Sequence, residues 1–159
     1  MNQLFESFVR NFYKLEQSKF KPVKKETIKW KFTTSDNDIH YLPQMETDIT
    51  LENDSEKIII DTKYYRETMT LNYDKEKINS SNLYQLFSYL LNQEDESSKT
   101  KFATGILLYP TIEKDYDLHF KYKDHNIHIK TLNLNSNWRD ISLSLKNIIE
   151  VESAELIQL

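Results

Sequence analysis

The sequence of 159 residues contains no cysteine, one glycine and three prolines. Without cysteine, neither a disulfide framework nor a thiolate metal site can form, and a reducing cytoplasm is the expected compartment. Because Gly and Pro are scarce, turns have to be located from clusters of Asn, Asp and Ser. The N-terminal segment carries charges throughout and lacks a continuous apolar run, so it predicts neither a signal peptide nor a membrane span. We expect a soluble protein.

The chain is rich in residues that can form a hydrophobic core. Hydrophobic residues make up 38% of it and aromatic residues 13%, which predicts a folded protein. At this length we expect a single domain over residues 1–159. The formal net charge is −4, and a mildly acidic chain is a poor autonomous binder of a polyanion. A local basic patch or a partner would have to supply the attraction for nucleic acid.

Hydrophobic periodicity predicts an alternation of helices and strands. Amphipathic helices are expected over 3–17, 80–93 and 137–152, the second capped by Ser80 or Ser81. Strands are expected over 21–34, 45–52, 57–65, 102–110, 117–123 and 125–134, with loops over 34–43 and 66–79. Such a mixture of hairpins and crossover helices predicts an α/β fold, a mixed β-sheet flanked by helices on both sides.

Two neighbouring strands are joined by the four residues Asn-Asp-Ser-Glu at 53–56, which is turn chemistry for a hairpin loop. This loop length predicts that Glu52 faces Lys57. The same register then places Asp48 directly opposite Asp61, on one face of the ribbon. The sequence therefore predicts two carboxylates side by side on adjacent strands.

A pair of facing carboxylates requires a counter-charge, because like charges placed opposite each other destabilise a sheet. Carboxylate oxygens are ligands that Mg²⁺ prefers, and the ion keeps waters that can attack a phosphate. Lys63 lies on the same face of its strand as Asp61 and would place a positive charge beside the attacking water. The alternative is a structural ion pair, in which a surface lysine lies next to a salt-bridged aspartate.

Four ordered blocks, ETDITLE, IIIDTKYY, NLYQLFSYL and GILLYP, resemble the C-terminal nuclease domain of McrC, the endonuclease subunit of the Mcr modification-dependent restriction system. The opening LFESFVRNFY and the later TIKW also resemble that family, so the resemblance covers almost the whole chain. It implies a PD-(D/E)xK restriction-endonuclease-like core with Asp48, Asp61 and Lys63 at the catalytic positions. It also implies Mg²⁺, or Mn²⁺ in its place, as the cofactor held by the two aspartates. Thr47 stands where the motif has proline.

The resemblance extends to supporting residues. The segment QLFSY at 85–89 matches the QxxxY pattern of nucleases similar to RecB, whose Gln and Tyr lie near the active site. Gln85 and Tyr89 are therefore expected to contact DNA phosphate or to orient the metal site, the alternative being ordinary polar residues on a helix edge. Glu6 resembles the helix-borne acid that often completes metal binding in this superfamily, with Glu16 as its rival. Either glutamate is alternatively a solvated helix charge.

Two other patterns favour ordinary structural roles. Six lysines lie within residues 19–31, interleaved with aromatic residues that continue through Trp30 and Phe32. Such a face can contact the DNA backbone, but it is more often merely solvated with its rings in the core, and we expect the latter. His125 and His128 are three residues apart on an expected strand and point to opposite faces, which favours two ordinary histidines over a shared zinc ion.

The resemblance implies an Mg²⁺-dependent DNA endonuclease with a partner similar to McrB, a GTP-hydrolysing AAA+ ring that recognises modified, methylated DNA. No glycine-rich phosphate loop occurs in the chain, so nucleotide hydrolysis must come from that partner. Family members usually carry an N-terminal region that docks on the motor, and since none precedes residue 1 we expect an excised domain or a short variant. The oligomeric state stays open, and a homo-oligomer is compatible with the sequence.

Two alternative functions remain. One is another PD-(D/E)xK nuclease, such as a RecB-like repair enzyme or a phage-defence nuclease, which would keep the same metal site. The other is a non-catalytic DNA-binding or assembly module. The presence of Asp48, Asp61 and Lys63 together argues against the second, since a decayed site tends to lose one of its residues.

Overall fold

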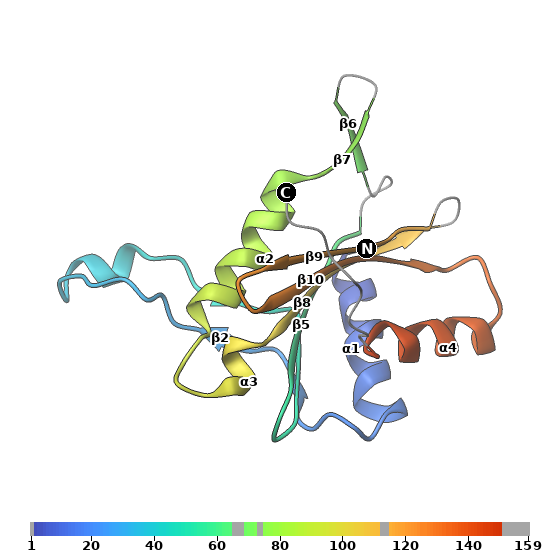
Figure 1. The fold of residues 1–159 in the computed structure, drawn as a ribbon, viewed down its shortest axis with the longest axis horizontal. Helices are drawn as coiled ribbons and strands as arrows, with labels where there is room; N and C mark the ends of the chain where they lie inside the picture. Colours follow the sequence, from blue (N-terminus) through green and yellow to red (C-terminus); the bar gives the residue numbers. More distant parts are fainter. Residues whose placement is uncertain (1, 65–68, 73–74, 112–114, 151–159) are drawn as a thin grey trace.

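The computed structural model describes residues 2–64, 69–72, 75–111 and 115–150 (Figure 1). Its helices are α1 (Asn2–Glu16), α2 (Ser80–Asn92), α3 (Ser98–Lys101) and α4 (Trp138–Ile148), with a 3₁₀ helix η1 (Asp38–Tyr41). Its strands are β1 (Val23–Lys24), β2 (Thr27–Ile28), β3 (Met45–Glu46), β4 (Ile49–Glu52), β5 (Lys57–Thr62), β6 (Met69–Asn72), β7 (Lys75–Ile78), β8 (Thr104–Thr111), β9 (Asp117–Tyr122) and β10 (His125–Asn133).

A six-stranded mixed sheet organises the molecule, in the order β1-β4-β5-β8-β10-β9. Strands β5, β8 and β10 are parallel, whereas β1, β4 and β9 pair antiparallel to their neighbours. The apolar run in β8 is buried on both faces because β8 lies between two parallel neighbours under helices. The predicted α/β fold, with a mixed sheet flanked by helices, is confirmed and agrees with a PD-(D/E)xK-like core.

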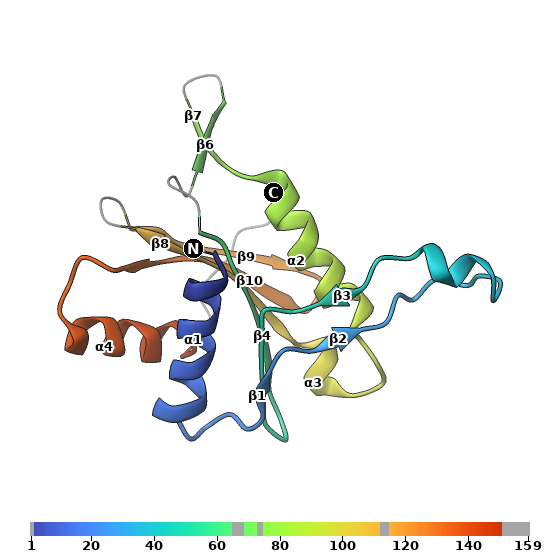
Figure 2. The same cartoon turned by 180° about the vertical axis from the view of Figure 1, so that it is seen from behind.

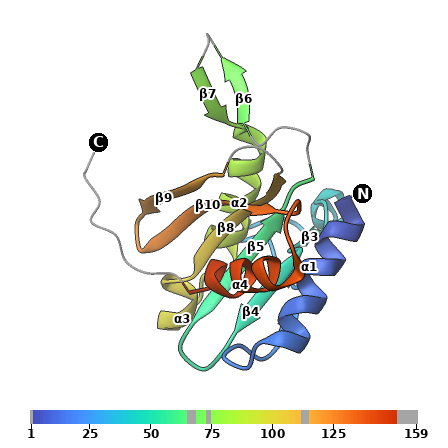
Figure 3. The same ribbon diagram turned by 90° about the vertical axis from the view of Figure 1, so that its right-hand side faces the viewer.

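Helices cover both faces of the sheet. Figure 3 shows α1 and α4 in front of the sheet and α2 behind it. The front layer buries Phe5, Val9 and Phe12 of α1 together with Leu145 and Ile148 of α4. The back layer buries residues of α2 against odd-numbered residues of β5, β8 and β10. In the part of the chain that the structure describes, no helix combines the length and the apolar character needed to cross a membrane.

The packing of α2 on the sheet depends on the chain's single glycine. Gly105 on β8 lies beneath Leu86 and Leu90, both fully buried. A Cβ at this position would come within 2.9 Å of Leu90 Cδ1 and 3.0 Å of Leu86 Cδ1. The missing side chain therefore allows α2 to lie close to β8.

The hairpin register is as predicted. Glu52 pairs with Lys57, and Ile49 pairs with Ile60 at the end of the ladder, so Asp48 and Asp61 follow directly on the last paired residues. The expected strand at 45–52 is nevertheless divided, because β3 pairs with β2 in a separate two-stranded sheet.

The division coincides with an extra residue. Between the β1–β4 and β2–β3 pairings, residues 25–26 on one strand oppose residues 47–49 on the other. Thr47 N donates to Glu26 O at 2.9 Å, and Glu26 N donates back to Thr47 Oγ1 at 3.0 Å. This two-against-three arrangement is that of a β-bulge, which bends a strand and re-aims its side chains. Asp48 lies within it.

The expected strand at 21–34 was wrong beyond Ile28. Its first part forms only β1 and β2, since the bend at the bulge interrupts the partner strand as well. Residues 29–44, which we call the arm, extend away from the six-stranded sheet and include η1 (Figure 2). Phe32 is 60% exposed, so the expectation that the aromatic residues of this segment lie in the core was wrong for Phe32.

Three smaller expectations also need correction. The loop expected at 66–79 contains the hairpin β6–β7, although residues 65–68 and 73–74 lie outside the described residues. Helix α2 is capped by Asn79 rather than by a serine, since its Oδ1 accepts hydrogen bonds from the backbone of Ser81 and Asn82. The helix expected at 137–152 is α4, which ends at Ile148; residues 151–152 lie outside the described part.

Candidate active site

The two aspartates and the lysine meet where β4 begins and β5 ends. Asp61 is fully buried on β5, and Lys63 follows directly after that strand, with its backbone N–H bonded to Leu108 O at 2.9 Å. Lys63 Nζ lies 2.9 Å from Asp61 Oδ2. Asp48 Oδ2 accepts two hydrogen bonds from Thr62, one from its backbone N–H at 2.8 Å and one from its hydroxyl at 2.9 Å. The hairpin thus gathers both carboxylates and the ammonium group at one end of the sheet.

The electrostatics of the pair reflect burial. Burial raises the pKa of Asp61 to about 7, and the nearby charge of Asp48 adds to this rise against the attraction of Lys63. Burial also raises the pKa of Asp48 above its usual range, although the hydrogen bond from the Thr62 backbone opposes the shift. Two mutually repelling carboxyls in a site that disfavours their charge have the electrostatic character of a cation site.

Helix α2 joins this site through a chain of hydrogen bonds. Lys63 Nζ donates to Gln85 Oε1 at 2.6 Å, and Gln85 Nε2 donates to the Tyr89 hydroxyl at 2.7 Å. The hydroxyl of Tyr89 in turn donates to the backbone carbonyl of Glu46 at 2.9 Å. Burial, with the negative charge of Asp61 nearby, raises the pKa of Tyr89 to about 12, so the phenol remains a donor. Gln85 and Tyr89 therefore hold the ammonium group of Lys63 from the α2 side.

Helix α1 contributes Glu6 from the other side. Arg10 Nη1 bonds to Glu6 Oε1 at 2.6 Å and to the backbone carbonyl of Asp48 at 3.1 Å, and Lys25 Nζ lies 3.1 Å from Glu6 Oε1. Burial opposes ionisation of Glu6, but hydrogen bonds from Arg10 and Lys25 outweigh it and lower its pKa. The charge of Glu6 also reaches both aspartates. Glu16, its rival, is exposed at the far end of the helix.

The donor set fits a hard divalent cation. Both carboxylate oxygens of Asp61 are buried, and neither accepts a well-directed hydrogen bond from the described residues. The ammonium group of Lys63 offsets this burial only in part, and buried anionic oxygens are costly unless a further cation or solvent completes their coordination. Among residues 2–64, 69–72, 75–111 and 115–150, no three His, Cys, Asp or Glu side chains converge as a metal cluster. Two carboxylates with water and substrate phosphate as the remaining ligands are what Mg²⁺ commonly takes.

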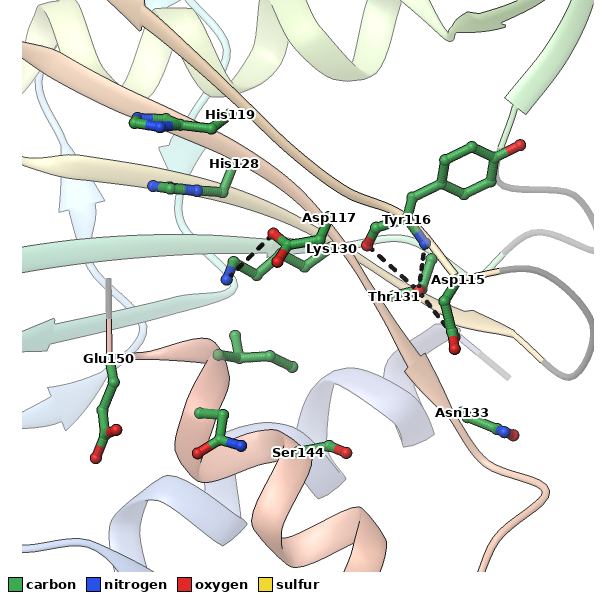
Figure 4. A pocket seen from close by; sticks show the side chains of 12 residues that line it. Asp115, Tyr116, Asp117, His119, His128, Lys130, Thr131, Asn133, Ser144 and Glu150 are labelled. Carbon is green, nitrogen blue, oxygen red and sulfur yellow. Dashed lines mark hydrogen bonds and ion pairs between the residues drawn. The ribbon is translucent and has the colours of Figure 1, made fainter. Parts of the chain in front are cut away.

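A separate cavity lies outside this constellation, between the β9–β10 edge and α4. It has a volume of about 640 Å³, and Figure 4 shows His119 and His128 as parallel rings within it, with Lys130 reaching Asp117. The two rings stack with centroids 4.3 Å apart. His125 contacts Ala103 O and Glu94 instead. None of the predicted site residues lines this cavity.

Comparison of the sequence with known proteins identifies its family. The family model described as "McrBC 5-methylcytosine restriction system component" matches residues 1–110, which include every predicted site residue. The chain belongs to this McrBC family. A curated relative, the "Type IV methyl-directed restriction enzyme EcoKMcrBC" of Escherichia coli (strain K12), is 30% identical over 151 residues. The match covers 94% of this chain and 42% of the relative, so the chain spans less than half of that protein's length. The resemblance to McrC is confirmed.

In this McrBC-family chain, the site also includes contacts from two residues that the sequence analysis did not predict. Thr62 holds Asp48 across the ribbon, and the predicted register already placed it next to Asp61. Arg10 links Glu6 to the backbone of Asp48, and its spacing of four residues from Glu6 on an amphipathic helix was an available signal. The tertiary contact from Arg10 to residue 48 had no local signal, because it depends on where α1 lies against the sheet.

Proposed function

We propose that this chain is the DNA-cleaving domain of a McrBC-type restriction system, hydrolysing phosphodiester bonds with Mg²⁺ as cofactor. The observation that supports the proposal most is the buried, hydrogen-bond-deficient carboxylate of Asp61 beside Asp48 and the ammonium group of Lys63. Family membership adds support, since the matched relative is described as a methyl-directed restriction enzyme. A GTP-hydrolysing partner similar to McrB belongs to the same proposal.

Each residue has a distinct role in the proposed reaction. Asp48 and Asp61 would hold Mg²⁺, which when bound supplies Lewis-acid polarisation of phosphate and water. Thr62 keeps Asp48 oriented and supports its anionic form, because its N–H and O–H both donate to the carboxylate. Lys63 presents positive charge where negative charge develops as water attacks phosphorus and the P–O bond breaks. The proton that the attacking water loses goes to solvent, and the leaving oxygen takes up a proton from solvent or receives this one.

Gln85 and Tyr89 act on Lys63 rather than on the phosphate in this proposal. Their hydrogen-bonded chain ends on the backbone of Glu46, close to the bulge that carries Asp48. The chain thereby ties the ammonium group to the segment that presents one of the carboxylates. Glu6 adds negative charge next to the aspartates and is itself held by Arg10 and Lys25.

A plasmid assay tests the reaction. Supercoiled methylated and unmethylated plasmids are incubated with the protein and Mg²⁺ or Mn²⁺, alone and with a McrB-like partner and GTP. We expect nicking by the parent and a rate loss of about 10²- to 10³-fold for Lys63→Ala, the magnitude typical of losing one charge-stabilising group. Lys121→Ala, an exposed lysine on β9, is the matched control and should cleave like the parent.

Two outcomes would contradict the proposal. Equal cleavage by Asp61→Ala and the parent would remove the metal site from the mechanism. Absence of cleavage under every condition, with the partner and GTP present, would remove the nuclease activity itself. Cleavage of linear but not circular DNA would instead favour an exonuclease similar to RecB.

A further inference from the structure

The arm, residues 29–44, is built as a defined projection. Trp30 Nε1 donates to Pro43 O at 2.7 Å and so joins its two limbs near the base. Lys31 N donates to Asn92 Oδ1 at 2.9 Å, which ties the base to the end of α2. Near the tip, η1 follows a turn in which the N–H of Asp38 bonds to Ser35 O at 3.1 Å. Figures 1 and 2 show the arm reaching out beyond α2.

The arm exposes large apolar side chains. Phe32 is 60% exposed, Ile39 53% and Tyr41 88%. The rings of Trp30 and Phe32 stack on each other with centroids 5.2 Å apart and planes 12° apart. Ring stacking holds Phe32 in place while most of its surface remains in water. A projection that presents ordered rings to solvent is typical of a contact surface.

The base of the arm also carries uncompensated positive charge. Lys29 and Lys31 are exposed, and within the described residues neither has an acidic partner. Lysines earlier in the same segment differ, because Lys24 lies 3.7 Å from Glu52 and Lys25 bridges Glu6 and Glu46. Lys29 and Lys31 are thus cations without an acidic partner among the described residues, and they lie where the segment leaves the sheet next to the exposed rings.

The arm begins and ends beside the candidate site. It joins β2 to β3, and the carbonyl of Glu46 in β3 accepts the hydrogen bond from Tyr89. Asp48 follows Glu46 by two residues. A polymer whose backbone reaches the paired carboxylates would continue past the base of the arm on this side of α2.

We infer that the arm binds the DNA that flanks the cleaved bond, with Lys29 and Lys31 on backbone phosphates and Phe32 against a deoxyribose or base. Basic residues interleaved with exposed aromatic rings are the features that nucleic-acid surfaces combine. A protein partner fits less well, because lysine is depleted in the buried centres of protein interfaces. The inference rests on the proposed function, in which DNA is the polymer that is cut.

DNA binding tests the arm independently of cleavage. The affinity of a fluorescein-labelled duplex is measured by anisotropy, with Ca²⁺ in place of Mg²⁺, over a series of salt concentrations. The variants are Lys29→Ala/Lys31→Ala and Phe32→Ala. The matched control is Lys121→Ala/Lys146→Ala, which removes the same charge from exposed positions on β9 and α4. Circular dichroism melting confirms that every variant is folded.

The two arm variants should differ in kind. For Lys29→Ala/Lys31→Ala we expect the slope of log affinity against log salt to fall by about 2, since each phosphate contact contributes roughly 0.9. For Phe32→Ala we expect a loss of about fivefold or more with the slope unchanged, as for a stacking contact. The control variant should keep the parent's affinity and slope.

The inference is overturned if both arm variants bind DNA as the control does, or if the folded parent shows no salt-dependent binding. Weaker capture of a McrB-like partner by Phe32→Ala, with DNA binding unchanged, would likewise overturn it and assign the arm to that partner. Failure of the proposed function looks different: the parent and Asp61→Ala would both leave plasmid intact while the arm variants still lost DNA affinity.

Discussion

The ammonium nitrogen of Lys63 lies 2.9 Å from Oδ2 of Asp61, yet its directed hydrogen bond goes to Gln85 at 2.6 Å. Asp61 is consequently an ion-paired carboxylate without a well-directed donor, fully buried on a central strand. The attraction of Lys63 does not offset the cost of burial, since the pKa of Asp61 is raised to about 7.

Replacing the buried charge should stabilise the metal-free protein. In the folded state Asp61 stays protonated up to its pKa of about 7, whereas in the unfolded chain it ionises near 3.8. The parent should therefore lose stability as pH rises between these values, by on the order of 1 kcal/mol per pH unit. For Asp61→Asn we expect a flatter profile and a higher Tm than the parent at pH 8, measured by thermal unfolding in EDTA. Asp54→Asn, in the exposed hairpin turn, should have the same dependence of Tm on pH as the parent. If the Tm of Asp61→Asn fell with pH as steeply as that of the parent, the prediction would be wrong.

Divalent metal should stabilise the parent through the same group. A ligand that binds the folded state raises Tm by mass action, and a carboxylate must lose its proton to coordinate a metal. We expect Mn²⁺ to raise the Tm of the parent more at pH 8 than at pH 6. The shift should vanish in Asp61→Asn and shrink in Asp48→Asn. An equal shift in Asp54→Asn and Asp61→Asn would place the metal elsewhere.

Thr62→Val tests the support of Asp48. The substitution keeps the backbone hydrogen bond to Asp48 Oδ2 and removes the one from the hydroxyl. We expect a stability loss of about 1 kcal/mol in urea unfolding and weaker metal binding by calorimetry, because one donor that favours the carboxylate is gone. Thr27→Val, exposed on β2, is the control. Unchanged metal affinity in Thr62→Val would show that the backbone donor is sufficient.

Gln85 should act only through Lys63. Since Gln85 accepts from Lys63 and is anchored by Tyr89, Gln85→Ala should lower kcat by about tenfold with little change in KM. In a Lys63→Ala background the same change should cost nothing further, which a double-mutant cycle of cleavage rates measures. Tyr89→Phe should have the same pattern with a smaller effect. Additive losses would mean that Gln85 contacts the substrate directly.

The pH dependence of thermal unfolding and the rate of DNA cleavage should show which of the two helix glutamates, Glu6 or Glu16, supports the site. The lowered pKa of Glu6 contributes stability that is present above its ordinary value of 4.5 and is lost as pH falls through its folded value. Glu6→Gln should therefore unfold at lower temperature than the parent at pH 7, with the gap closing in acid, and should cleave DNA more slowly. Glu16→Gln, at an exposed position, should match the parent in both assays. The reverse result would make Glu16 the supporting acid.

Local rules predicted the hairpin well. A four-residue loop of Asn, Asp, Ser and Glu left little freedom in register, so the pairing of the two strands followed from counting residues. The same count predicts that Asp48 and Asp61 lie on adjacent strands near each other. The same is true of the continuous apolar run of β8 and of the alternating strand β10, whose patterns are unambiguous. The layer order followed from the sequence of element types.

Nonlocal geometry was not predictable in the same way. The bulge that carries Asp48 depends on how β1 and β2 pair with the opposite strand, and no residue in ETDITLE indicates an extra position. The alternation of Trp30 and Phe32 is that of a strand, but the partner strand bends away before reaching them. Arg10 reaches residue 48 only because α1 lies across the sheet at that point.

Gly105 has a consequence that extends beyond close packing. Leu86, one of the two side chains that rest on it, is adjacent in sequence to Gln85, so the height of α2 above β8 also sets how far that amide extends toward the amine of Lys63. A methyl group added at position 105 would force the side chains of Leu86 and Leu90 to shift, and would so disturb the packing of α2 without changing any polar atom. Gly105 thereby influences the candidate site through packing alone.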